Sequence, residues 1–551
     1  MKRQIQNIFE NIDIKLFNIV LLLNIISSAF TFLGEINLNV IGGITLICLS
    51  VFFTFIICIF ANILKVKKEI YLIYKIGIIV LLMFFILVEV FLWINFGILF
   101  DENIFSVIEG TNIKESYDFI VTYFNTQTII TLLSIIALII ILYYVTAFLL
   151  KNNLGVRIFI LLSLTFTIFK ISTSVYSSIN YGFGGHLAAY STFSRIGRAL
   201  FLHHKFKVET DCLIKNIQKI ESTTLSTKCD KIVVIIGESY SKYHSQLYGY
   251  NKNTSPNLNK KAEDNEIYVF TNVVSPFNDT ERAFRAIYSL GATNEGAYSE
   301  YMLFPYAFKS AGWKTYNIDN MDLARNTSRV KDSRELSNLM FDYRNDVTFQ
   351  YDEEIIKIIN NKKSSQSLYV VKLKGQHYTY PDTYPSTYKK FNSEKDYTDK
   401  DVSKTAKEII ADYDNSTLYN DYVVNTIIEN FKNDNAVVIY FSDHGEEIYE
   451  SRNYMGHGGT SPCLNFQVEI PFIVWMSDKY KYNNPDVVEN IIKNQGMPYT
   501  TDYVAHTILD MAGVSCPQFI PKRSIANNLF ELIDKRIVNY SLIYEKDIAH
   551  K

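Results

Sequence analysis

The fold is decided by the stretch Lys231-Ile-Val-Val-Ile-Ile-Gly-Glu238-Ser239, an apolar, β-branched run that ends abruptly in polar residues. A second stretch, Ala436-Val-Val-Ile-Tyr-Phe-Ser-Asp443-His444-Gly-Glu446, ends in the same way. Each pattern is typical of a buried parallel strand that delivers side chains at its carboxyl end. In open α/β sheets the ligand crevice lies at those ends. The two stretches therefore predict that Glu238, Asp443 and His444 meet around one divalent metal ion.

Strand and helix patterns alternate over the C-terminal part of the chain. The expected strands are 231–236, 267–274, 314–318, 368–374, 436–442 and 470–475, and the expected helices are 281–290, 352–361, 403–432 and 500–512. This order predicts an α/β domain with a mostly parallel sheet, which we assign to residues 229–551. The polar stretch 376–402 is expected to be a long surface loop near the site.

Long apolar runs are concentrated in the N-terminal third. Five of them approach the ~20 residues that span a bilayer: 16–33, 38–64, 71–98, 127–150 and 156–175. Basic residues precede the first run and separate runs two from three and four from five, whereas the loop 99–126 is acidic. Residues 1–175 are therefore expected to form a five-helix transmembrane domain with a cytoplasmic N-terminus, so that loop 99–126 and everything after the domain lie outside the cytoplasm. One re-entrant run would invert that orientation.

Residues 176–228 are interpreted as a connector. Its stretch Arg195–Lys205 mixes basic and apolar residues, which suits a helix lying on the membrane surface or an ordinary amphipathic linker. The net charge of the chain is −2, so a nucleic-acid partner is not indicated. Cys212, Cys229, Cys463 and Cys516 lie in the exported part. An even number there predicts two disulfides, with Cys212–Cys229 favoured by proximity and free buried thiols as the alternative.

The residue types indicate which metal ion would bind and which side chain would be the nucleophile. Carboxylate and imidazole ligands without thiolates fit a catalytic zinc ion, and manganese or magnesium less well. The candidate nucleophiles are Ser239, Ser275 and Thr280. Thr280 is favoured because it begins a helix, whose free N–H groups and dipole attract phosphate. A metal-bound hydroxyl would be activated for attack, whereas the alternative is a plain N-cap threonine.

Two further histidines stand in polar, glycine-containing surroundings. His377 follows the strand 368–374, and His457 lies between two glycines after His444. Either could donate to a phosphoryl oxygen or protonate a leaving group. His506, in an apolar helix, is expected to be a core residue.

Together these residues resemble the alkaline-phosphatase superfamily, and more closely the membrane phosphoethanolamine transferases that modify lipid A and other surface glycans. The strongest stretch is Ile236-Gly-Glu-Ser-Tyr-Ser-Lys-Tyr-His-Ser-Gln-Leu-Tyr-Gly-Tyr-Asn-Lys-Asn-Thr-Ser-Pro256. It resembles the family pattern of Gly-Glu-Ser/Thr, then Leu-Tyr/Asn-Gly-Tyr, then Thr-x-Pro. The resemblance implies a zinc site made by Glu238, Thr280, Asp443 and His444, with Thr280 as nucleophile and with His377 and His457 as phosphate and substrate ligands.

The loop 99–126 resembles the family's loop between spans three and four, which holds the lipid head group through Asn, Thr and Glu at four-residue spacing. Thr111 and Glu115 fit and are expected to bind substrate, but the Asn position is Val107 here. The segment Ile318–Arg325 lacks the Cys-Lys-Gly of some members. These departures favour an acceptor other than the lipid A phosphate.

The implied reaction is a two-step transfer. Thr280 attacks the phosphate of phosphatidylethanolamine, diacylglycerol leaves, and the Thr280-phosphoethanolamine intermediate passes to lipid A, lipopolysaccharide core or another envelope glycan. The enzyme would be a monomer in the bacterial inner membrane with a periplasmic catalytic domain.

Two other interpretations stay open. A phosphoglycerol transferase of the lipoteichoic-acid-synthase type shares the five spans, the metal site and the threonine. A membrane sensor with a degenerate phosphatase-like domain would be non-catalytic. The loop and the stretch Leu247–Tyr250 favour ethanolamine, and the complete ligand set argues against the sensor. Sulfatase activity is disfavoured because the chain has no Cys-x-Pro-Ser-Arg.

Overall fold

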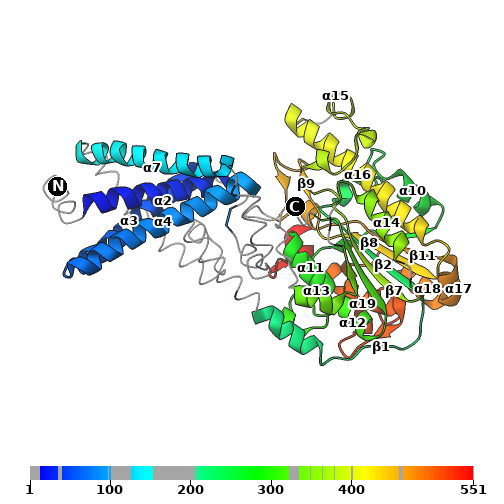
Figure 1. The fold of residues 1–551 in the computed structure, drawn as a ribbon. Coiled ribbons are helices and arrows are strands. Elements are labelled where there is room, and N and C mark those ends of the chain that lie inside the picture. Colours follow the sequence, from blue (N-terminus) through cyan, green and yellow to red (C-terminus); the bar gives the residue numbers. More distant parts are fainter. Residues whose placement is uncertain are drawn as a thin grey trace. The chain divides into compact units, whose positions relative to one another are not determined.

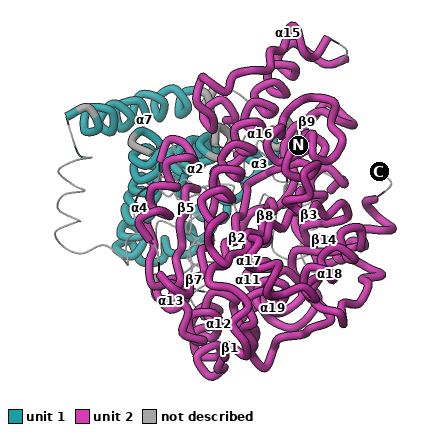
Figure 2. The backbone as a smooth tube through the Cα atoms, turned by 90° about the vertical axis from the view of Figure 1, so that its right-hand side faces the viewer, with its two compact units in different colours: residues 1–206 teal, residues 207–551 magenta. Residues whose placement is uncertain are grey.

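The structure is a computed structural model of the chain. It describes residues 13–34, 40–96, 99–100, 124, 126–152, 204, 208–321, 334–345, 347, 349–362, 364–377, 379–398, 401–457 and 463–549. The chain divides into two compact units, residues 1–206 and 207–551, shown in teal and magenta in Figure 2.

The N-terminal unit contains long apolar helices, drawn in blue to cyan in Figure 1: α2 (Ile14–Gly34), α3 (Val40–Leu64), α4 (Lys68–Phe96) and α7 (Thr126–Asn152). Three described segments are long and apolar enough to cross a membrane, namely Ile44–Leu64, Lys68–Ile94 and Thr128–Phe148, and Ile14–Phe30 is a shorter apolar helix. The four helices overlap four of the expected spans. The run 156–175, Thr111 and Glu115 lie outside the described residues.

Hydrogen bonds between helices α2 and α3 accompany their apolar packing. Nδ2 of Asn24 donates to Oγ1 of Thr54 at 3.0 Å, and the hydroxyls of Ser28 and Ser50 lie 2.7 Å apart. All four side chains are buried. Such small polar residues allow close approach and bonding between helices in a bilayer.

The C-terminal unit is built on a mostly parallel sheet, as predicted. In its described part, seven strands pair in the order β3-β11-β8-β2-β7-β5-β6. Their bounds are β2 (Lys231–Gly237), β3 (Ile267–Phe270), β5 (Lys314–Asp319), β6 (Tyr343–Arg344), β7 (Ser367–Lys372), β8 (Ala436–Ser442) and β11 (Phe472–Met476). Strand β11 pairs antiparallel with β8 and β3, and the other described pairs of this sheet are parallel. Every residue of the central strands β2, β7 and β8 is buried, which explains their continuous apolar sequences.

Helices cover both faces of this sheet (Figure 1). Alternate residues of β2 point to opposite faces. Ile232, Val234 and Ile236 pack with residues of α11 (Thr280–Tyr288), α12 (Phe304–Ser310) and α19 (Val504–Ala512). Val233 and Ile235 pack with residues of α14 (Ile356–Asn361) and α16 (Lys404–Asn430). The remaining described helices include α10 (Pro256–Glu263), α13 (Arg334–Met340), α17 (Asp478–Asn483) and α18 (Pro485–Asn494).

Helix α16 buries a polar face. Its side chains bond to loops: Asp421 accepts from the backbone N–H of Leu258 at 2.8 Å, and Asn415 accepts from that of Phe391 at 2.7 Å. Ser416 donates to the Gly375 carbonyl at 3.1 Å. Buried backbone groups of loops need such partners. The helix therefore holds several loops of the unit in place.

Two expectations are corrected. The stretch 376–402 is more than a surface loop, because Tyr380 and Tyr397 are buried in an apolar cluster with residues of α16. Cys212, Cys229, Cys463 and Cys516 form no disulfide, so the prediction of two disulfides is wrong. Cys229 is buried, with its sulfur 3.9 Å from the Met511 carbonyl, whereas Cys212 is exposed. The two cysteines of the favoured disulfide therefore lie in different surroundings.

The expected surface helix Arg195–Lys205 lies outside the described residues except for His204. Residues 208–217 are helical, and their Leu213, Ile214 and Ile217 join the core of the C-terminal unit.

Candidate active site

Strands β2 and β8 end side by side and bring three predicted ligands together. The strands are parallel, with Gly237 opposite Ser442, and the backbone N–H of Asp443 donates to the Gly237 carbonyl at 3.0 Å. Glu238, Asp443 and His444 follow directly and are each at most 1% exposed. Nε2 of His444 lies 3.6 Å from Oε1 of Glu238 and 3.5 Å from Oδ2 of Asp443.

The polar contacts of this group fit a metal ion. Oδ1 of Asp443 accepts from the backbone N–H groups of Ser239 and His444, at 3.1 and 2.7 Å. Its Oδ2 is buried and has no hydrogen-bond partner in the described part of the chain. Nδ1 of His444 lies 2.9 Å from the Gly445 carbonyl, which leaves Nε2 for a metal. A buried carboxylate oxygen without a partner is costly unless a cation satisfies it.

Thr280 joins the same group from the first turn of α11. Its Oγ1 lies 3.2 Å from Nε2 of His444 and 3.4 Å from both carboxylate oxygens of Glu238. The N-cap of α11 is Asp279, whose side chain accepts from the backbone N–H of Arg282. Thr280 is therefore not the N-cap, and its hydroxyl faces the predicted ligands.

The two alternative nucleophiles have other contacts. The hydroxyl of Ser275 donates to the Phe277 carbonyl at 2.8 Å within its own turn. The hydroxyl of Ser239 lies 2.8 Å from Oε1 of Glu238, but its side chain is only 1% exposed. Of the three hydroxyls, that of Thr280 contacts both Glu238 and His444 and remains partly exposed.

His457 lies beside the predicted ligands and bonds to Glu446, a contact that the sequence did not reveal. Its Nδ1 bonds to Oε2 of the buried Glu446, which also accepts from the Tyr380 hydroxyl at 3.0 Å. The rings of His457 and His444 lie 4.0 Å apart. Glu238, His444 and His457 offer ligand atoms within 4.8 Å of one another, so His457 could hold a metal as well as a substrate. The stretch Asp-His-Gly-Glu contains Glu446, but spacing alone did not pair it with His457.

The loop after β7 approaches Glu238 through Gly375. The backbone N–H of Gln376 donates to the Glu238 carbonyl at 3.0 Å. Gly375 has φ +51°, and a Cβ there would lie 2.9 Å from the Glu238 nitrogen, so only glycine fits. His377 follows; it is exposed, and its charge lowers the pKa of Glu238 against the larger effects of burial and of Asp443. His506 bonds to the Leu290 carbonyl at 3.0 Å, as expected for a core residue.

The electrostatics of the group favour a bound cation. Burial raises the pKa of Glu238, and the Asp443 carboxylate raises it further. Burial raises the pKa of Asp443 to about 6 and lowers that of His444. At His457 burial acts to lower the pKa, but Glu446 outweighs it and raises the pKa to about 9. The raised pKa values mean that Glu238 and Asp443 do not readily ionise together in this buried site. A metal ion would stabilise both carboxylates in their charged forms.

A match to known proteins agrees with this geometry. The sulfatase family model matches residues 230–514, about half of the chain and the region that holds Glu238, Thr280, Asp443 and His444. The chain belongs to the sulfatase family. Its fold class and its resemblance to phosphoethanolamine transferases within this family are confirmed by the relatives below.

Curated relatives match about half of the chain. The chain is 32% identical over 321 residues to phosphoethanolamine transferase EptC of Escherichia coli K12, a match that covers 56% of this chain and 55% of that protein. It is 29% identical over 287 residues to phosphoethanolamine transferase EptA of Helicobacter pylori, covering 50% of this chain and 52% of that protein. The chain thus spans about half the length of the curated relatives it matches.

Solved structures extend the comparison. The zinc complex of the periplasmic domain of E. coli EptC is 28% identical, with a TM-score of 0.53, and covers 59% of this chain and 95% of that chain. The integral membrane protein EptA of Neisseria meningitidis is 16% identical, with a TM-score of 0.56, and covers 93% of this chain and 97% of that chain. The similarity to the second structure includes the N-terminal helices as well as the sulfatase domain.

Proposed function

We propose that the chain transfers phosphoethanolamine from phosphatidylethanolamine to a cell-envelope glycan through a covalent Thr280 intermediate. The observation that carries the proposal is the position of the Thr280 hydroxyl, which lies 3.2 Å from His444 and 3.4 Å from Glu238 at a helix N-terminus. The names of the relatives support phosphoethanolamine as the transferred group.

Glu238, Thr280, Asp443 and His444 would hold a zinc ion, with manganese or magnesium fitting this donor set less well. The unpartnered Oδ2 of Asp443 and the zinc complex of E. coli EptC support this part of the proposal. Bound there, zinc would act as a Lewis acid that lowers the pKa of the threonine hydroxyl and neutralises charge on the phosphoryl group.

The first step forms a bond between Oγ1 of Thr280 and phosphorus and breaks the bond from phosphorus to the glycerol oxygen. The hydroxyl proton of Thr280 passes to solvent, and the departing diacylglycerol oxygen takes up a proton. Because Nδ1 of His457 bonds to Glu446, Nε2 of His457 would be the ring nitrogen that supplies that proton or binds a phosphoryl oxygen. His377 is assigned the second substrate contact.

The second step reverses the roles. An acceptor hydroxyl or phosphate attacks phosphorus, the bond to Thr280 breaks, and Thr280 regains its proton. The same groups would serve both steps.

The proposal also assigns a location in the cell to each part of the chain. We assign residues 1–175 to the inner membrane, 176–228 to the connector and 229–551 to a monomeric periplasmic catalytic domain, with Thr111 and Glu115 as donor contacts. Confinement to the layer that holds the donor lipid raises its effective concentration. The acceptor is lipid A, lipopolysaccharide core or another glycan.

The test is the intact mass of the purified full-length protein after incubation with phosphatidylethanolamine. Wild type is expected to gain one phosphoethanolamine group and to release diacylglycerol, and Thr280→Ala is expected to do neither. Ser275→Ala is the matched control, because it removes a neighbouring buried hydroxyl that bonds to Phe277 within its own turn.

An adduct on both wild type and Thr280→Ala would move the nucleophile, with Ser239→Ala as the next variant. An adduct formed from phosphatidylglycerol instead would establish the phosphoglycerol transferase. No adduct from either lipid in zinc-loaded protein would leave the non-catalytic sensor.

A further inference from the structure

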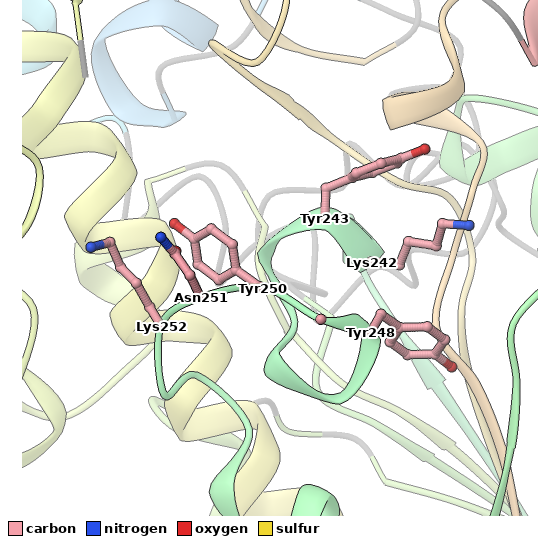
Figure 3. Close-up of a pocket in the computed structure, with 7 residues that line it drawn as sticks. Lys242, Tyr243, Tyr248, Tyr250, Asn251 and Lys252 are labelled. Carbon is pink, nitrogen blue, oxygen red and sulfur yellow. The ribbon is translucent and has the colours of Figure 1, made fainter. Parts of the chain in front are cut away.

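A cleft of about 420 Å³ opens beside the segment that follows Glu238 (Figure 3). It is lined by residues of the segment 242–252, including Lys242, Tyr243, Tyr248, Tyr250 and Lys252. This volume falls in the ~300–1,000 Å³ range of small-molecule sites. None of the proposed zinc ligands or histidines lines it.

The aromatic walls of the cleft are fixed by hydrogen bonds. The Tyr248 hydroxyl accepts from the backbone N–H of Phe472 at 2.7 Å, and the Tyr250 hydroxyl donates to Asp414 at 2.9 Å. The Tyr243 hydroxyl accepts from Nδ2 of Asn465 at 2.6 Å. Rigid tyrosine rings offer a large amphipathic contact surface at low entropic cost. Flat, polar rings with apolar faces, such as sugars, suit such walls.

The charge of the lining is positive. Lys242 and Lys252 line the cleft, and its lining includes no acidic residue. Lys242 pairs with Glu469. Lys252 donates to the Asp396 carbonyl, and its Nζ lies 4.5 Å from the centre of the Tyr397 ring. A carbonyl and an aromatic ring do not neutralise its charge, so Lys252 can attract an anion.

Two connections link the cleft to the proposed nucleophile. The first is the segment 239–241, which the Tyr413 hydroxyl fixes by donating to the Ser239 carbonyl at 2.6 Å and accepting from the Ser241 N–H at 2.8 Å. The second is the turn 465–467, where Asn465 bonds to Tyr243 and Gln467 accepts from Asn278 at 2.9 Å, two residues before Thr280.

We propose that this cleft binds an anionic saccharide, the acidic or phosphorylated sugar of the acceptor. The assignment to the acceptor rests on the proposed function, whereas the binding itself is a property of the cleft alone. Lys252 supplies the positive charge and the tyrosine rings supply the contact surface. The donor fits less well here because its zwitterionic head group has no flat ring to lie against the tyrosines.

The experiment measures binding of digalacturonate to the full-length protein by saturation-transfer NMR, with its uncharged dimethyl ester as the matched ligand. Wild type is expected to bind the acid and to bind the ester about tenfold more weakly, the size of one charged hydrogen bond. Lys252→Met, which keeps the length of the side chain, is expected to lose about the same factor for the acid, and Lys252→Arg to restore it. Lys260→Met is the control, since Lys260 is exposed on α10 and does not line the cleft.

Equal binding of acid and ester by wild type, or no binding of either, would overturn the proposal. So would undiminished acid binding by Lys252→Met, which would place the anion elsewhere, including at the zinc ligands. If Lys252→Met has a lowered melting temperature, the proposal is tested by the ratio of the affinities for the acid and the ester in wild type and in Lys252→Arg. The Thr280 adduct of wild type is measured in parallel, because its absence would remove the proposed function without changing the binding result.

Discussion

Asp279 caps helix α11, so the hydroxyl of the neighbouring Thr280 does not serve as the cap. Oδ1 of Asp279 accepts from the backbone N–H of Arg282 at 3.1 Å, and Oδ2 accepts from its Nε at 2.6 Å. The threonine, one residue later, directs Oγ1 to His444. In this arrangement the cap and the proposed nucleophile are separate residues, although both residue types commonly serve as caps.

The first prediction concerns that cap. Asp279→Ala is expected to cost about 1 kcal/mol of stability. It should also slow formation of the Thr280 adduct, because a small displacement of a reacting group is expensive. Asp279→Asn, which can still accept from the backbone, should retain more of both. Melting temperature and adduct rate are the measurements, and an alanine variant that matches wild type in both would contradict the prediction.

The second prediction concerns Glu446. Glu446→Gln should lower the transfer rate by roughly 10- to 100-fold, the usual effect of losing a partner that orients a functional histidine. Tyr380→Phe removes only the second hydrogen bond to Glu446 and should have a smaller effect. Zinc content is measured alongside the rate. Equal losses of zinc and rate would mean that Glu446 serves the metal rather than the orientation of His457.

The third prediction tests the close approach at Gly375. Gly375→Ala should both destabilise the protein and abolish most transfer, because its Cβ would meet the Glu238 backbone at 2.9 Å. Gly312→Ala is the matched control, since Gly312 also has positive φ (+87°) but has no atom within 4 Å of its Cβ position. The control should lose about 1 kcal/mol of stability and keep its transfer rate. Similar transfer rates for the two variants would refute the argument.

The fourth prediction concerns the metal. Chelation of zinc should lower the melting temperature, because a ligand bound only to the folded state stabilises it by mass action. Asp443→Asn should lower the zinc content and should show a smaller change on chelation. The measurements are elemental analysis and melting curves with and without chelator. Full zinc occupancy in Asp443→Asn would remove Asp443 from the ligand set.

The fifth prediction is a pH dependence away from the site. Burial raises the pKa of Asp421 to about 6, against the opposing hydrogen bonds from Leu258 and Asn257. Because the folded-state pKa lies above the unfolded value, the contribution of Asp421 is complete below about pH 4 and is lost as the pH rises through about 6, by at most ~3 kcal/mol. The stability of wild type relative to Asp421→Asn should therefore fall between pH 4 and pH 8. A difference that stays constant over this range would contradict it.

Much of the site could be predicted because it stands at the ends of strands with strong local patterns. The runs before Glu238 and Asp443 are apolar throughout, and parallel pairing brings their ends together. Contacts between distant segments carry no such pattern. The pairing of Glu446 with His457 depends on how the chain 447–456 folds back through β9 (Glu447–Ile448) and β10 (Met455–Gly456). The cap at Asp279 was missed for a different reason, because Asp and Thr have similar preferences at the start of a helix.

The two errors have a common physical origin. Composition suggested that polar 376–402 would lie on the surface, but Tyr380 and Tyr397 are buried with their hydroxyls bonded to Glu446 and Asp414. Cysteine number suggested disulfides, but pairing requires two thiols that face each other, which number alone does not determine.

The buried polar face of α16 reverses the usual rule for which helix positions tolerate change. Asp414, Asn415, Ser416, Thr417, Asn420 and Asp421 are each at most 2% exposed. In a saturation mutagenesis profile, these polar positions should tolerate substitution as poorly as the neighbouring valines and isoleucines. A conservation score weighted by hydrophobicity would overlook them, and a redesign that filled this face with leucine would release the loops that α16 holds through Leu258, Phe391 and Gly375.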